Sequence, residues 1–141
     1  MNPTTAPTQA RGSIGLLTKL SKVVFRRADE ETIGMRLKQL VALEHLRDND
    51  SCLQQGLAEM LMLDANNCVL LLNELDEDGY VERRRDPQDR RRHIVEITPA
   101  GLEALADGER RLEDLEDEVL SHLSAAERRK LHELLSKALD E

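Results

Sequence analysis

The sequence predicts a mainly α-helical protein that carries one small β-hairpin. Apolar residues make up 40% of the 141 residues, but the chain has only one Phe and one Tyr, so its core must consist mainly of leucine. Leucines recur at helical spacing through most of the chain, and 34% of all residues are charged, which is typical of helices that bury one apolar face. Residues 75–101 differ, because they contain two short β-leaning runs around a turn.

The chain begins with a polar segment, which we expect to form a disordered tail over residues 1–12. This segment is rich in Pro, Thr, Ala and Gln and offers nothing large to bury. It lacks the apolar stretch of a secretory signal, and no run in the chain approaches the ~20 apolar residues that a membrane span needs. The two cysteines have no CxxC spacing. We therefore expect a cytoplasmic protein with reduced thiols.

Six segments carry apolar residues at the spacing of an α-helix. Capping chemistry supports several of their starts: Ser51 suits the N-cap of the third helix, Asp64 that of the fourth, and Ser124 with Glu127 forms a capping box before the last. The acidic run at 29–31 and Gly34 predict a break between the first and second helices. We expect helices over residues 13–28, 36–47, 53–61, 65–78, 99–122 and 124–139.

The predicted β-hairpin lies between the fourth and fifth helices. Gly79 is expected to end the fourth helix in a left-handed conformation, and strands follow at Tyr80–Arg83 and His93–Ile97. Residues 86–89 suit a type I turn, and Thr98 with Pro99 suits a new helix start. The hairpin carries six arginines against two aspartates: Arg83, Arg84, Arg85, Arg90, Arg91 and Arg92, with Asp86 and Asp89.

Together these elements predict a winged helix-turn-helix over residues 33–98. Two short helices separated only by residues 62–64 have helix-turn-helix spacing, and a ribbon with arginine on both arms is a wing. The terminal helices are too long and one-sided to be covered by so small a domain, so residues 13–32 and 99–141 are expected to interlock in a homodimer. The net charge of −8 argues against indiscriminate coating of nucleic acid, but it allows a local basic surface.

At this point the sequence resembles the MarR family of bacterial transcriptional regulators over about residues 13–139. The resemblance is most specific in the acidic-Gly-Tyr-Val-Glu-Arg run that ends at Arg83, the Asp-Pro-x-Asp-x-Arg wing at 86–91, and the Ile-Thr-x-x-Gly helix start at 97–101. Residues 34–40 also resemble the family's entry to its second helix. The resemblance implies a sequence-specific double-stranded DNA-binding regulator, a repressor that binds a pseudo-palindromic operator as a homodimer and is released by a small aromatic or phenolic acid. Half-sites would lie about 34–36 Å apart.

The candidate DNA-binding residues come from two helices and the wing. The first turns of a recognition helix face the bases, and Asn can bond bidentately to adenine; helix-start chemistry explains the same asparagines equally simply. By the resemblance, Asp89 braces Arg91, which enters the minor groove, where a narrow groove attracts Arg. Ser51 and Gln54 open the third helix and could hold phosphates, although ordinary capping also explains Ser51. The full candidate set is Ser51, Gln54, Asn66, Asn67, Asn73, Arg85, Asp89, Arg90, Arg91 and Arg92.

Two alternatives stay open because the chain departs from the family pattern. The fourth helix has no Lys or Arg, and Met62 stands where the family commonly has Gly, which favours an acidic winged-helix protein-interaction module with weak or lost DNA reading. A second alternative is a redox-responsive regulator that uses Cys52, near a helix start that would stabilise a thiolate. The sequence has no nucleophile elbow, P-loop, dinucleotide-binding motif or zinc-ligand spacing, so we expect neither an enzyme nor a metal site, and no cofactor besides the effector.

Overall fold

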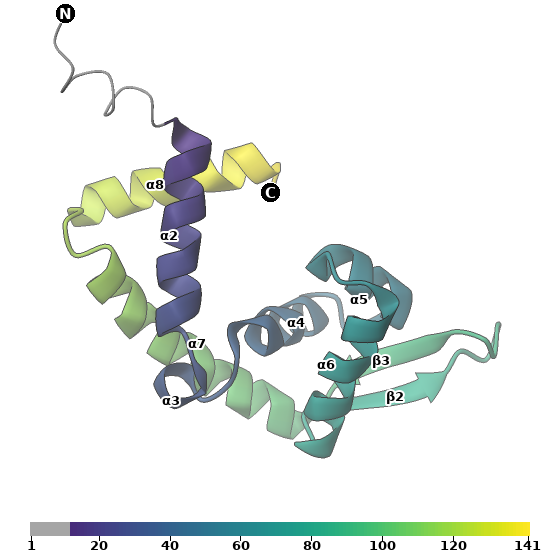
Figure 1. Cartoon of the computed structure of the whole chain (residues 1–141). Coiled ribbons are helices and arrows are strands. Elements are labelled where there is room, and N and C mark those ends of the chain that lie inside the picture. Colours follow the sequence, from purple (N-terminus) through teal and green to yellow (C-terminus); the bar gives the residue numbers. More distant parts are fainter. Residues whose placement is uncertain (1–11) are drawn as a thin grey trace, which may run out of the picture. The chain divides into compact units, whose positions relative to one another are not determined.

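The computed structural model describes residues 12–141, which divide into two compact units (Figure 1). The larger unit is Ala28–Leu112, and the other combines the chain up to Arg27 with Glu113–Glu141. The tail predicted over residues 1–12 lies almost entirely outside the described residues.

The smaller unit consists of helices, as predicted. It contains α2 (Ser13–Arg27), the end of α7 (Pro99–Val119) and α8 (Ala125–Leu139). The capping box is confirmed: the Glu127 amide donates to Ser124 Oγ, and the Ser124 amide donates to Glu127 Oε1. Ion pairs join Arg27 to Glu118 and Arg128 to Asp117. Among its described residues only Leu115 is a buried large apolar side chain, so this unit has almost no core of its own.

The larger unit contains the remaining elements and a leucine-rich core. In chain order these are α3 (Glu30–Ile33), α4 (Leu37–Asp48), β1 (Ser51–Leu53), α5 (Gln54–Leu61), α6 (Ala65–Glu77), β2 (Val81–Arg85), β3 (His93–Ile97) and the first part of α7. The predicted spacing holds for most of the side chains that it directs inward, which are fully buried, but Met60 and Leu102 are 38% and 43% exposed. The fully buried side chains include Leu40, Leu43, Leu46, Leu57, Leu72, Leu75, Val81, Val95 and Leu105.

The sheet has three antiparallel strands in the order β1-β3-β2, where the sequence predicted only two. In β1, Ser51 lies opposite Glu96 and Cys52 opposite Val95. The prediction that Ser51 caps the third helix was therefore wrong: α5 begins at Gln54, and its N-cap, Leu53, makes no side-chain capping bond. The free edge of β3 supplies hydrogen-bonding partners to this backbone, which outweighs the capping preference of one serine.

A second local difference lies before α4. The acidic run that was expected only to interrupt two helices forms the one-turn helix α3. Asp29 caps it, because its side chain accepts from the Thr32 amide at 2.9 Å, and these bonds lower the pKa of Asp29. Gly34 ends it in a left-handed conformation with φ 81°.

The junction of α6, β2 and α7 explains the Thr-x-x-Gly pattern. Thr98 Oγ1 donates to the Gly79 carbonyl at 2.6 Å and accepts from the Gly101 amide at 3.0 Å, while the Thr98 amide donates to the Tyr80 carbonyl. Gly79 has the predicted positive φ, 77°. A Cβ on Gly101 would lie 2.2 Å from the Tyr80 oxygen. The start of α7 therefore packs directly on the backbone that connects α6 to the hairpin, and this fixes where the hairpin leaves the recognition helix.

Candidate nucleic-acid interface

The tip of the hairpin is built from two turns instead of the single predicted one. Asp86 Oδ1 accepts from the Gln88 amide at 3.0 Å, and the Arg92 amide donates to the Asp89 carbonyl at 2.9 Å. The hydrogen-bonded turn therefore spans residues 89–92 rather than 86–89. Asp86 instead forms an Asx turn, in which its side chain accepts from the Gln88 amide, and the Asp86 amide donates to the Arg92 carbonyl at 3.0 Å.

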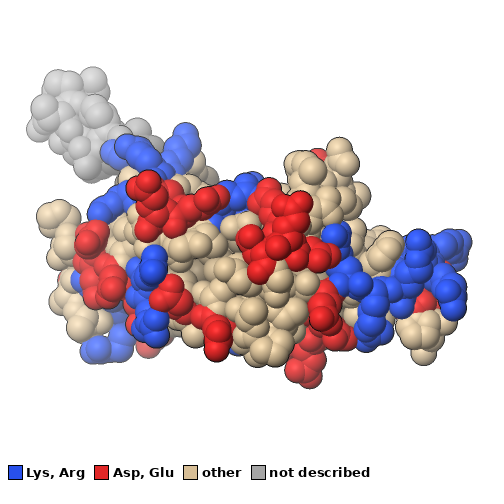
Figure 2. Space-filling view, turned by 90° about the horizontal axis from the view of Figure 1, so that it is seen from below, with Lys and Arg blue, Asp and Glu red and all other residues tan. Residues whose placement is uncertain are grey.

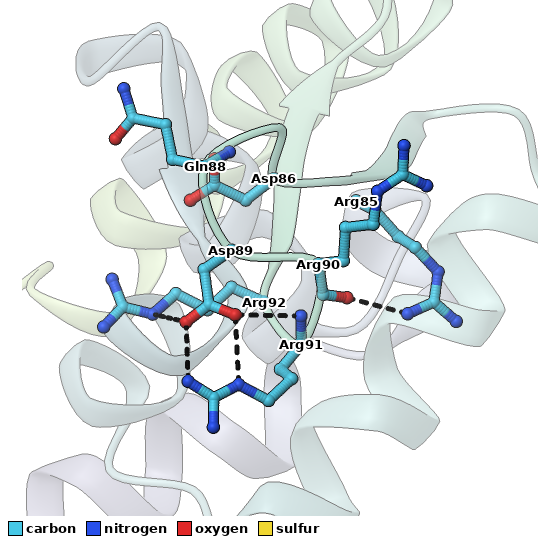
Figure 3. Close-up of polar contacts among 7 residues, drawn as sticks. All are labelled: Arg85, Asp86, Gln88, Asp89, Arg90, Arg91 and Arg92. Carbon is cyan, nitrogen blue, oxygen red and sulfur yellow. Dashed lines mark hydrogen bonds and ion pairs between the residues drawn. The ribbon is translucent and has the colours of Figure 1, made fainter.

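The later turn places three charged side chains together, as Figure 3 shows. Asp89 accepts from Arg91 Nε at 3.1 Å and from Arg91 Nη2 at 3.3 Å, and Arg92 Nε lies 3.5 Å from the same carboxylate. These bonds, first of all those from the Arg91 side chain, hold the pKa of Asp89 below its usual value. The predicted brace of Asp89 on Arg91 is thus present, whereas entry of Arg91 into a minor groove stays a prediction.

The braced guanidinium is presented outward. The Arg91 side chain is 91% exposed, and only two of its five N–H groups bond to Asp89. The other three have no partner among residues 12–141. A cation that is held in one orientation with donors to spare suits contact with a phosphate or with acceptors on a groove floor.

The other arginines of the hairpin separate into two groups. Arg83 pairs with Asp76 of α6 at 3.0 Å, and Arg84 pairs with Glu96 of β3 at 2.7 Å, so both stabilise the hairpin itself. Arg85 donates to the Arg90 carbonyl at 2.7 Å and crosses the tip. Arg90 and Arg92 remain exposed beside Arg91. The structure therefore distinguishes arginines with structural partners from those available to DNA. The alternation of side chains along a strand could not make this distinction.

Helix α6 presents an uncharged face at its first turns. Asp64 is its N-cap as predicted, and it accepts from both the amide and the side-chain Nδ2 of Asn67. The side chain of Asn67 is therefore already used in capping, in line with the simple helix-start explanation. Asn66 is exposed, Asn73 is half-buried, and Leu70 between them is 55% exposed. Leu70 belongs to the first turns that were expected to face the bases, but it was not selected as a candidate, although its spacing from Asn66 could have indicated it.

A groove of about 470 Å³ lies between α5, the start of α6 and residues 91–93 of the hairpin. Gln54 and Gln55 line one side of it, and Arg91, Arg92 and His93 line the other. The structure thus brings Gln54 together with Arg91 and Arg92 in a groove that Glu59 also lines, and binding of a phosphate there stays a prediction. Ser51 is not among the lining residues and belongs to the sheet instead.

The cysteines do not form an activated thiol. Burial raises the pKa of the Cys52 thiol, and the neighbouring Cys68 raises it further; burial alone raises the pKa of Cys68. Cys52 lies in β1, one residue before the N-cap of α5, so it is near a helix start as predicted, but its thiol pKa is raised and the expected stabilisation of a thiolate is not seen. Both cysteines are free. Cys68 lies on the buried face of α6, as predicted.

The charge of the interface contrasts with that of the chain. Residues 83–92 carry a net charge of +4, so the other 131 residues carry −12. Figure 2 shows Lys and Arg gathered at the hairpin and acidic side chains interspersed elsewhere on this face. Among residues 12–141 no group of three or more His, Cys, Asp or Glu side chains could hold a metal, and no helix there is long and apolar enough to cross a membrane.

The chain is similar to known regulators along most of its length. Residues 33–92 match the MarR family. The "putative transcriptional regulatory protein for hcr operon" of Thauera aromatica is 32% identical over 113 residues, 80% of this chain and 68% of that protein. The HTH-type regulator BilQ of Clostridium symbiosum is 27% identical over 81% of this chain and 79% of that protein. Among solved structures, a mutant of MarR from E. coli complexed with operator DNA has a TM-score of 0.73 at 25% identity, covering 88% of this chain and 91% of that chain.

Proposed function

The chain belongs to the MarR family of transcriptional regulators and is a DNA-binding regulator, and from this premise we propose that it is a homodimeric repressor of a pseudo-palindromic operator. The observation that carries this proposal is the exposed, Asp89-braced Arg91 at the tip of a hairpin in the same compact unit as α6. In an otherwise acidic chain, this is the surface to which a DNA backbone is attracted.

In the proposed complex α6 lies in the major groove and the hairpin reaches the adjacent minor groove. Asn66 and Asn73 face the base edges, and Arg90, Arg91 and Arg92 face the minor groove and its phosphates. Gln54, at the start of α5, binds a phosphate across the groove that it shares with the arginines. Arg85 stabilises the tip through its hydrogen bond to the Arg90 carbonyl.

The homodimer is supported by the uncovered apolar surface of the smaller unit. Large apolar side chains on α2 and α8 are more than a third exposed, Ile14 by 77% and Leu139 by 67%. A monomer gains nothing by leaving such residues in water, and an equal surface on a second copy would bury them. The other members of this surface are Leu16, Leu17, Phe25, Leu134 and Leu135.

Release of the operator by a small aromatic or phenolic acid completes the proposal. Such a ligand need only bind more tightly to a conformation of the dimer in which the spacing of the two DNA-binding lobes does not match two half-sites than to the DNA-binding conformation. A difference of a few kcal/mol between the two states would empty the operator. Working on chromosomal DNA, the protein acts in the cytoplasm.

The test is selection of bound fragments from a pool of genomic DNA, with the affinity of each enriched fragment followed against salt concentration. We expect a pseudo-palindrome with a steep negative salt dependence. Arg90→Ala combined with Arg91→Ala should abolish binding, whereas Arg83→Ala, on the same hairpin but paired with Asp76, should not. Weak binding that is equal for all sequences, after removal of any co-purified effector, would instead support an acidic protein-interaction module, which the absence of Lys and Arg from α6 favours.

A further inference from the structure

The outward face of α6 has a composition unusual for a surface that reads DNA. Asn66, Leu70 and Asn73 follow one another at i, i+4 and i+7, and they lie opposite the buried stripe of Cys68, Leu71, Leu72 and Leu75. None of the thirteen residues of this helix is basic. The centre of the outward face is thus a leucine flanked by two amides.

Two acidic residues border this face: Glu77 continues the stripe in the last turn and is exposed, whereas Glu74 is already engaged. Glu74 pairs with Arg36, the N-cap of α4, and accepts from Gln39 Nε2 at 3.1 Å. The Asn67 side chain is held by Asp64 at 3.0 Å. Asn66 and Leu70 are therefore the exposed side chains of the first two turns that no described residue holds in place.

These residue types restrict which base pairs the face can recognise. In the major groove guanine presents two acceptors that Arg or Lys bind best, and α6 has neither. Adenine presents one acceptor and one donor, which match the amide of Asn66. The C5-methyl of thymine is the apolar group that a major groove offers, and it is the contact that an exposed leucine can use.

We propose that α6 selects A·T base pairs: Leu70 packs on a thymine methyl and Asn66 binds an adenine beside it, so the core of each half-site contains no essential G·C pair. This inference rests on the proposed function and specifies its substrate. It follows that base selection by this protein depends on apolar contact, while its charge-dependent affinity comes from the hairpin.

The experiment replaces thymine by deoxyuridine, which lacks only the C5-methyl, at each thymine of an enriched operator in turn. For the full-length protein we expect one thymine per half-site at which the replacement lowers affinity about fourfold, the equivalent of roughly 0.8 kcal/mol for one buried methyl group. Leu70→Ala should bind thymine and uracil DNA equally at that position. Leu102→Ala, which shortens an exposed leucine on α7 of the same unit, should keep the discrimination. Asn66→Ala should reduce the preference for adenine at the neighbouring pair.

The outcomes separate the two proposals. If no fragment is enriched, the proposed function fails and this inference fails with it. If an operator is found but every uracil replacement is neutral, or if its core requires G·C pairs, the inference alone is overturned. It is also overturned if Leu70→Ala changes the oligomeric state in size-exclusion chromatography, because Leu70 would then be a contact between subunits.

Discussion

Replacement of Gly101 by alanine tests whether the junction of α6, the hairpin and α7 is as tight as the structure indicates. The new Cβ would lie 2.2 Å from the Tyr80 oxygen and 2.8 Å from Ile97 Cγ1, and real Cβ contacts essentially never fall below 3.0 Å. The start of α7 must therefore move away from the Tyr80 backbone by at least the difference of 0.8 Å. That backbone is held by the Tyr80 amide, which donates to the Leu75 carbonyl, and by the Thr98 amide, which donates to the Tyr80 carbonyl, so the helix has to yield.

The expected cost follows from what this displacement breaks. Forced overpacking typically costs about 1–3 kcal/mol. The bonds from Thr98 to the Gly79 and Tyr80 carbonyls would be stretched, and each contributes about 1 kcal/mol. Alanine restricts the unfolded chain and returns roughly 0.4–1 kcal/mol. We expect Gly101→Ala to lower the free energy of unfolding by about 3–4 kcal/mol, a large share of the ~5–15 kcal/mol of a typical domain.

The assay is urea unfolding followed by circular dichroism, with Gly56→Ala as the matched control. Gly56 lies in α5, and a Cβ there would meet nothing within 4 Å. In a helix alanine is better than glycine by about 0.5–1 kcal/mol, so this variant should be more stable than the original protein. The same chemical change should thus have opposite signs at the two positions. A loss at Gly101 below about 1 kcal/mol would refute the close approach described here.

Three further predictions concern the wing, a carboxyl pair and a turn. Arg91→Lys keeps the charge but loses the planar guanidinium that binds Asp89 through two N–H groups. Operator affinity, measured by fluorescence anisotropy, should therefore fall about tenfold, while its dependence on salt concentration stays unchanged. Unaltered affinity would contradict the role of the Asp89–Arg91 contact. Burial, a hydrogen bond with Glu109 and the charge of Glu109 raise the pKa of Glu44 to about 7. Since the folded pKa exceeds the unfolded one, the stability that protonated Glu44 contributes is complete below its usual pKa, about 4.5, and is lost as the pH rises through about 7. Urea midpoints at pH 5.5 and pH 8 should therefore differ less in Glu44→Gln, and an unchanged difference would exclude Glu44 as the cause. Met62 is 91% exposed and has a left-handed backbone conformation, with φ 58°. Met62→Gly removes a backbone strain of about 1–2 kcal/mol, part of which is offset by the greater freedom of glycine in the unfolded chain, so the free energy of unfolding should rise by a net ~0.5–1 kcal/mol. A decrease would show that Met62 makes a contact needed for folding.

The parts of this fold that the sequence predicted are those that local chemistry determines. The helix starts at Asp64, Thr98 and Ser124 depend on side chains within three residues of the amides that they bind. Helical and β periodicities likewise refer to neighbours along the chain. Each of these signals is complete within about one turn of backbone, so no knowledge of the tertiary structure is needed.

The parts that the sequence did not predict depend on residues far apart. Strand β1 exists because β3 has a free edge, and a three-residue segment gives no periodic pattern of its own. For the same reason the sequence did not show that Cys52, which was expected near a helix start, lies in a strand that ends at the N-cap of α5. The partners of the hairpin arginines could not be predicted for the same reason. Arg83 pairs with Asp76 of helix α6, and Arg84 pairs with Glu96 of the neighbouring strand, and both pairings depend on the tertiary structure. The Asp89 and Arg91 pair could be predicted because it is local and belongs to a recognisable pattern.

The separation of charge from base selection gives the acidic composition a physical role. Non-specific affinity for DNA depends on how many phosphates a protein neutralises, and the basic segment here is the hairpin, where residues 83–92 carry +4 against −12 in the rest of the chain. Repulsion between the acidic remainder and DNA weakens binding to every sequence equally. The contacts of the uncharged α6 face are added only at a matching site. The ratio of operator affinity to non-specific affinity decides how much protein reaches the operator among competing sites, and because the repulsion lowers both affinities alike, this ratio is set by the contacts of α6.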